Sequence, residues 1–145
     1  MISLHIEYDQ VDKIAIKSNW IKEICKKIMN DNGHDIANIT IIFTNDVTLH
    51  KLKKQYFKQD LYTDTITFNL EEDGGNIEGE VYISLDRIEE NSEIYRQDIL
   101  MECKRVIIHS FLHLVGYEDI LEKDKLLMTD LEDKYLKLSN NHIKN

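Results

Sequence analysis

Only four segments of this 145-residue chain carry the pattern of a β-strand, and they are unevenly spaced. Residues 2–8 alternate apolar and polar side chains, while 38–44, 65–69 and 80–84 are rich in β-branched or aromatic residues. The segments between them have the apolar period of helices or the polar character of loops. So few strands at such intervals do not fit a doubly wound parallel sheet. The pattern predicts an α+β fold with a single small mixed β-sheet of about four strands packed by about five helices.

The helices are expected at segments whose apolar residues share one face. The first begins at the capping residue Ser18. In the second, Leu49, Leu52 and Tyr56 are expected on the buried side. The five predicted helices are residues 18–31, 45–59, 86–95, 98–115 and 122–136.

The length fits one domain, which we place at residues 1–138, followed by a polar tail at 139–145 that is expected to fray. Apolar residues make up 42% and charged residues 31%, which excludes collagen-like, disordered and disulfide-scaffold classes. No apolar run approaches the roughly 20 residues of a membrane span, and the N-terminus lacks a signal-peptide pattern. We therefore expect a cytoplasmic protein with no membrane partner, in which Cys25 and Cys103 are buried, reduced thiols rather than a disulfide.

The net charge of −9 is unevenly distributed. Residues 1–58 hold nine basic and seven acidic side chains, whereas residues 59–145 hold nine basic and 20 acidic ones. The basic share is highest in residues 50–58, where lysines alternate with aromatic residues. This segment is either an RNA-contacting patch or the solvated face of an ordinary helix, and the two interpretations are equally compatible with the pattern. The candidate RNA-binding residues are Lys53, Lys54, Tyr56 and Lys58.

The segment 109–119, HSFLHLVGYED, indicates a metal site. His109 and His113 are four residues apart on a predicted helix, so both imidazoles leave the same face with Cβ atoms about 5–6 Å apart. Gly116 favours a helix end, after which the chain can turn back and bring Asp119 to the same ion. Two imidazoles and one carboxylate leave a fourth tetrahedral position open, as in catalytic zinc sites. The alternative is two histidines that merely share a helix face.

The spacing matches the metzincin pattern H-E-x-x-H-x-x-G-x-x-H except at two positions. Ser110 replaces the general-base glutamate, so a metalloprotease is the least favoured function. Asp119 replaces the third histidine, which is chemically acceptable because carboxylate oxygen binds zinc. Glu118 is the alternative third ligand, although the spacing favours Asp119.

Three blocks resemble the YbeY family of bacterial zinc-dependent endoribonucleases. HSFLHLVGYED resembles the family signature H-G-x-L-H-L-x-G-Y-D-H. Residues 52–68, LKKQYFKQDLYTDTITF, are similar to its L-N-x-x-Y-R-x-x-D-x-P-T-D-V-L-S-F block, and residues 79–84, GEVYIS, to its G-D-I-x-I-S strand. The resemblance covers about residues 38–136. Among the positions where this chain departs from these blocks, Phe57 replaces Arg, Tyr62 replaces Pro, Glu80 replaces Asp, Ser110 replaces Gly, and Asp119 replaces His.

The resemblance implies a single-strand-specific endoribonuclease that acts in ribosomal RNA maturation, in small-subunit RNA processing and in ribosome quality control. It implies one Zn²⁺ per chain, held by His109, His113 and Asp119, with ribosomal RNA and ribosomal particles as partners and no dinucleotide cofactor. Without an arginine at position 57, Arg105 is the candidate catalytic residue, because it lies one helical turn before His109 and its guanidinium could reach a phosphate. A salt bridge of Arg105 to a neighbouring carboxylate is the alternative. The alternative function is a ribosome-assembly factor with a mainly structural metal and weak or no cleavage.

Overall fold

The computed structural model describes residues 1–70 and 76–142, and a four-stranded sheet forms its centre. The strand order is β1-β2-β4-β3, in which β1 and β2 are parallel, β2 and β4 are parallel, and β3 runs antiparallel to β4. This mixed sheet with its five helices confirms the predicted α+β class. The strands are β1 (Ile2–Tyr8), β2 (Ala37–Thr44), β3 (Thr65–Asn69) and β4 (Ile77–Ser84).

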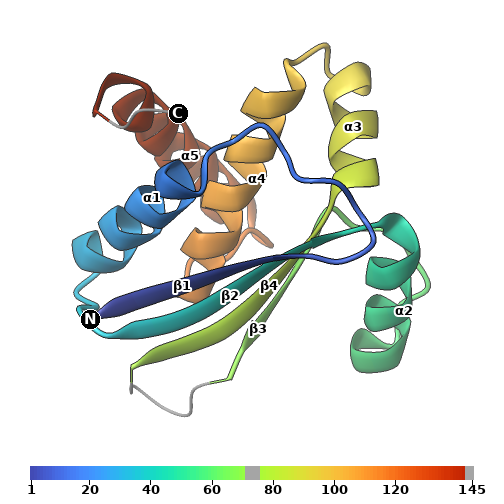
Figure 1. Ribbon diagram of the computed structural model, residues 1–145, viewed down its shortest axis with the longest axis horizontal. Coiled ribbons are helices and arrows are strands. Elements are labelled where there is room, and N and C mark those ends of the chain that lie inside the picture. The colour runs from blue at the N-terminus through green and yellow to red at the C-terminus, as the bar shows by residue number, and fades with distance from the viewer. Residues whose placement is uncertain (71–75, 143–145) are drawn as a thin grey trace.

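Most of the helices cover one face of this sheet (Figure 1). The long helix α4 packs against β3 and β4, and α1 and α5 pack against α4. On the opposite face, α2 lies near the β3 edge, where Phe57 approaches the ring of Phe68. The helices are α1 (Ser18–Asp31), α2 (Asp46–Phe57), α3 (Leu85–Ile94), α4 (Ile99–Leu114) and α5 (Glu122–His142).

The core lies between the sheet and α4, whose side chains Ile107, Ile108 and Phe111 have no exposed surface. Gly79 of β4 permits this close packing, because a Cβ at that position would lie 2.6 Å from Cδ2 of Leu114. Helix α4 is therefore held firmly against the sheet, and it carries both histidines of the signature.

The two cysteines are buried and unpaired, as predicted. Burial raises the pKa of the Cys25 thiol to about 12, and burial together with the charge of Glu102 raises the pKa of Cys103 to about 12. Both thiols are therefore protonated near neutral pH and act as small apolar side chains.

Several details differ from the sequence-based predictions. Helix α5 continues to His142, so residues 139–142 are helical rather than a frayed tail. The reason is that Ser139 lies on the buried face and its hydroxyl donates to the Leu136 carbonyl at 3.0 Å. Strand β4 begins at Ile77, three residues before the predicted start, because it pairs with β2 from Ala37 onward. Tyr56 was predicted on the buried side of its helix but is 58% exposed; its ring lies edge-on to Phe68 near the sheet margin.

The segment DGGN at 73–76, whose composition favours a turn, lies largely outside the described residues, as does the end of the predicted tail at 143–145. Within residues 1–70 and 76–142, no helix combines the length and apolar character needed to cross a bilayer.

Candidate metal centre and cleft

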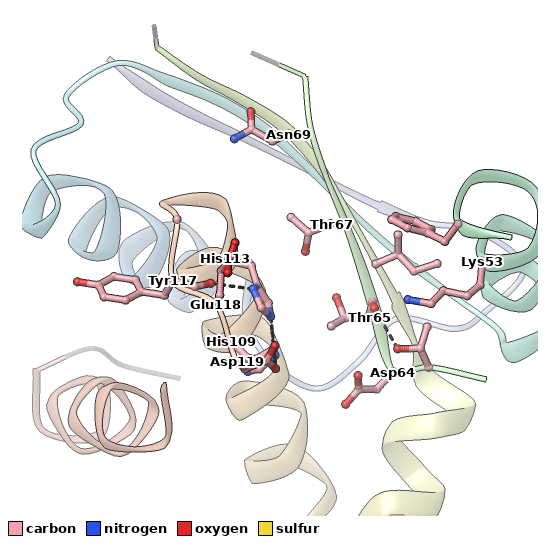
Figure 2. A pocket seen from close by; sticks show the side chains of 14 residues that line it. Lys53, Asp64, Thr65, Thr67, Asn69, His109, His113, Tyr117, Glu118 and Asp119 are labelled. Atoms are coloured by element: carbon pink, nitrogen blue, oxygen red, sulfur yellow. Dashed lines mark hydrogen bonds and ion pairs between the residues drawn. The ribbon is translucent and has the colours of Figure 1, made fainter. Parts of the chain in front are cut away.

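Three side chains of the signature meet at one point. Nε2 of His109 lies 3.0 Å from Nε2 of His113, and Oδ2 of Asp119 lies 3.4 Å and 3.7 Å from these two nitrogens. One ligand atom from each residue lies within 4.8 Å of the other two, an arrangement that can hold a metal ion. Figure 2 shows the two histidines on α4 with Asp119 beside them.

The end of α4 places Asp119 against the helix that it follows. Gly116 has a φ of +106°, which favours glycine, and its N–H donates to the His113 carbonyl at 3.0 Å. The next N–H, that of Tyr117, donates to the Leu112 carbonyl at 3.1 Å. These bonds turn the chain back along α4. Glu118, the alternative ligand, lines the nearby cleft but does not belong to the cluster found among the described residues.

The outer nitrogen of each imidazole is already bonded, which leaves the two inner nitrogens for an ion. Nδ1 of His113 donates to the Tyr117 carbonyl at 2.9 Å, and Nδ1 of His109 is bonded to Oε2 of Glu132 at 2.6 Å. In neutral rings this leaves lone pairs on both Nε2 atoms, which face each other and the Asp119 carboxylate. Three converging acceptors repel one another unless a cation or a proton lies between them. This donor set fits a divalent metal such as zinc, with the orienting hydrogen bonds usual for metal-binding histidines.

The surroundings of the two histidines shift their pKa values in opposite directions. Burial alone would lower the pKa of His109, but the hydrogen bond and charge of Glu132, with the charges of Asp119 and Asp64, outweigh it and raise that pKa. Burial and the neighbouring His109 lower the pKa of His113 despite the charge of Asp119. The surroundings of His109 therefore favour positive charge on its ring, whereas those of His113 favour the neutral imidazole.

Arg105 lies one turn before His109, as predicted, and its guanidinium is paired with two carboxylates of α5. It donates to Oε1 of Glu132 at 2.8 Å and to Oδ1 of Asp133 at 2.6 Å. Arg105 does not line the cleft described below. The geometry is that of the alternative, a salt bridge to neighbouring carboxylates, and the predicted phosphate contact stays a prediction.

An open cleft of about 460 Å³ lies beside the cluster. Its walls come from α2, β3, the end of α4 and the loop that carries Asp119. Asp64 lies in this cleft, where burial raises the pKa of its carboxyl despite the opposing charge of His109. The cleft is thus a polar space large enough for part of a substrate, next to the candidate metal ligands.

Of the four predicted RNA-binding residues, one lines the cleft and three lie outside it. Lys53 lines the cleft, and its Nζ lies 4.7 Å from the ring centroid of Phe57, which also lines it. Lys54, Tyr56 and Lys58 are exposed at the end of α2 but do not line the cleft. The RNA-binding role of all four stays a prediction.

Two residues of the site were not predicted from the sequence. Glu132 is bonded to His109 from 23 residues further along the chain, and no local pattern marks it among the many acidic residues of α5. Asp64 falls within the block that resembles the family, and that block was the signal that could have singled it out.

Fold and site together define a class: α+β proteins with a candidate metal site of two helical histidines and a loop carboxylate beside an open polar cleft. Comparison with known proteins is consistent with this class. The family described as Endoribonuclease YbeY matches residues 3–140. The chain is 36% identical over 139 residues to Endoribonuclease YbeY of Flavobacterium psychrophilum, covering 95% of this chain and 96% of that protein. It is 40% identical over 113 residues to Endoribonuclease YbeY of Amoebophilus asiaticus, covering 77% and 74%.

A solved structure has the same fold. The solution structure of TM1509 from Thermotoga maritima aligns with a TM-score of 0.63 and 26% sequence identity, covering 92% of this chain and 87% of that one. The chain belongs to the YbeY endoribonuclease family, which confirms the resemblance found in its sequence.

Proposed function

We propose that this protein is a single-strand-specific, zinc-dependent endoribonuclease of ribosomal RNA maturation. Membership of the family supports the nuclease activity. The observation that carries the metal dependence is the convergence of His109, His113 and Asp119 beside the cleft. The proposed setting is the cytoplasm, with ribosomal RNA and ribosomal particles as partners, and with roles in small-subunit RNA processing and ribosome quality control.

In this proposal, the chain's own residues hold the metal and position the RNA. When bound, zinc supplies Lewis acidity at the scissile phosphate and lowers the pKa of water. His109, His113 and Asp119 provide its ligands, while Glu132 and the Tyr117 carbonyl fix the orientation of the two rings. Lys53 provides positive charge on the opposite wall of the cleft. The proposed catalytic role of Arg105 is to contact a phosphate of the RNA through its guanidinium.

The test is a cleavage assay with ribosomal RNA and with matched single- and double-stranded oligonucleotides, on protein loaded with one zinc per chain and freed of other nucleases. We expect cleavage of the single strand, loss of cleavage on removal of zinc, and loss of both zinc and cleavage in His113→Ala. Intact RNA after incubation with the zinc-loaded protein, with His113→Ala behaving identically, rejects the proposal.

A second candidate function, a ribosome-assembly factor with a mainly structural metal, is favoured by the charge of the cleft. Among the described residues that line it, Lys53 is the one lysine or arginine, whereas Asp64, Glu118 and Asp119 are acids. Phe57 adds no charge where the family carries arginine. Histidine-ligand variants that bind ribosomal particles and support assembly without cleavage would favour this function over the nuclease.

A further inference from the structure

Strand β3 forms one margin of the sheet, and its outer edge has no described strand beside it. Two hydrogen bonds fix which of its residues face β4: Leu70 N–H donates to the Glu78 carbonyl at 2.7 Å, and Ser84 N–H donates to the Asp64 carbonyl at 2.9 Å. In an antiparallel pair, every second residue is bonded to the partner strand. The main-chain groups of Ile66 and Phe68 therefore point toward β4, and those of Thr65 and Thr67 point outward.

The outer edge of β3 lies inside the cleft that contains the candidate metal centre. The cleft is lined by Lys53 and Phe57 of α2, which packs on one face of the sheet, and by His109 and His113 of α4, which packs on the other. A cleft lined from both faces must pass around the margin of the sheet. Figure 2 shows Thr67 of β3 across from His113, with Lys53 reaching in from α2.

Thr67 offers an unoccupied main-chain donor on this edge. At the neighbouring Thr65, the carbonyl accepts from the Thr63 hydroxyl at 3.2 Å. Thr67 lines the cleft, and no described residue bonds its main-chain N–H. Its Oγ1 is buried without a partner among the described residues, so the hydroxyl does not occupy the edge donor.

We infer that the main-chain N–H of Thr67 binds a phosphate oxygen of an RNA strand that lies extended along the edge of β3, beside the metal. This inference rests on the proposed nuclease function and deepens it by identifying the residue that positions the substrate. Main-chain N–H groups are common phosphate donors in complexes with nucleic acids. The N–H also provides a phosphate contact at a site where this chain has Phe57 in place of the family's arginine.

The first test observes the main chain directly by NMR, on zinc-loaded protein with a single-stranded 2′-O-methyl oligonucleotide. We expect the Thr67 amide proton to shift and to exchange more slowly with solvent when the oligonucleotide binds. The amides of Ile66 and Phe68, which are bonded to β4, serve as internal controls whose exchange stays unchanged. Binding that shifts the amide of Gly116 in the cleft but leaves the Thr67 amide unaltered overturns the inference.

The second test removes the donor by Thr67→Pro, which eliminates the N–H without breaking a bond to β4 and is tolerated at strand edges. The matched control is Thr67→Val, which keeps the N–H and the shape of the side chain. We expect Thr67→Pro to bind the oligonucleotide about 10- to 100-fold more weakly, because a hydrogen bond to a charged group contributes roughly 1.5–3 kcal/mol. Thr67→Val should bind like the wild type, and zinc content should be normal in both. A folded, zinc-loaded Thr67→Pro with wild-type affinity overturns the inference.

The two proposals can fail separately. Cleavage by the wild type, with an unaltered Thr67 amide and full activity in Thr67→Pro, leaves the nuclease function standing and rejects the role of Thr67. A protected Thr67 amide in a protein that cleaves no RNA supports the binding edge and rejects the nuclease. If Thr67→Pro does not fold, the amide measurement on the wild type decides.

Discussion

Nδ1 of His109 lies 2.6 Å from Oε2 of Glu132, a carboxylate whose side chain is only 9% exposed. The other oxygen of Glu132 accepts from Arg105, so one buried carboxylate connects the candidate metal centre to a cation outside the cleft. Glu132 thus orients the His109 ring and increases its basicity as a ligand, in the manner of carboxylates behind zinc-bound histidines.

Glu132→Gln is expected to weaken zinc binding about 10- to 100-fold, because the amide cannot provide the negative charge that supports His109. Zinc affinity is measured by competition with a chelator of known affinity. The matched control is Asp133→Asn, which removes a carboxylate that contacts Arg105 but not His109. Equal zinc affinity of Glu132→Gln and wild type would show that Glu132 does not support the metal centre.

Arg105→Ala separates two roles of this residue. The pairing with Glu132 leads us to expect a lower zinc affinity together with reduced cleavage, because the variant leaves the buried carboxylate with one fewer partner. Arg105→Lys should retain part of the zinc affinity through the remaining charge. Lost cleavage with unchanged zinc affinity in Arg105→Ala would instead support the phosphate contact predicted from the sequence.

Asp119→Ala is expected to reduce the zinc content of the purified protein well below one per chain, since it removes the third ligand. The measurement is metal content by plasma mass spectrometry on protein without a histidine tag or chelator. Glu118→Ala, at the neighbouring position, is the control and should retain zinc. Asp119→His should also retain it, because imidazole is an equally suitable ligand. Full zinc content in Asp119→Ala would place the third ligand elsewhere.

Tyr135 joins α5 to the end of α1, since its hydroxyl donates to Oδ2 of Asp31 at 2.8 Å. Burial acts to raise the pKa of Asp31, but hydrogen bonds from Tyr135 and Lys27, with nearby positive charge, outweigh it and lower the pKa. A carboxyl whose pKa is lower in the folded state stabilises the fold at pH values above its unfolded-state pKa of about 3.9. This stabilisation is lost as the pH falls through the folded-state pKa.

Tyr135→Phe should therefore lower the free energy of unfolding by about 1 kcal/mol at pH 7. The loss should become smaller as the pH falls toward the lowered pKa of Asp31. Urea unfolding at several pH values measures the difference. Tyr117→Phe is the control, because the Tyr117 hydroxyl donates to the neutral Asn32 amide at 3.0 Å. The change in unfolding free energy in this variant should be the same at pH 7 and at acid pH. A pH-independent effect of Tyr135→Phe would contradict the assigned charge interaction.

Local patterns were sufficient for the elements and for the metal cluster. Strand β3 has its predicted bounds, and α4 carries His109 and His113 on one face because four residues advance a helix by little more than one turn. Local patterns failed where burial comes from distant segments. Tyr56 has the period of a buried residue but lies at the margin of the sheet, and Ser139 has the polarity of a tail but packs inside.

The α+β class, the family and the three candidate ligands could be inferred from the sequence alone, because each rests on patterns within short segments of the chain. The packing of distant segments shows that Glu132 and not solvent is bonded to His109, that Arg105 is paired with Glu132 and Asp133, and that residues of β3 line the cleft. Those relations depend on how α5 and the sheet pack around α4. Such packing is set by the summed burial of many side chains, and no spacing within a single segment encodes it.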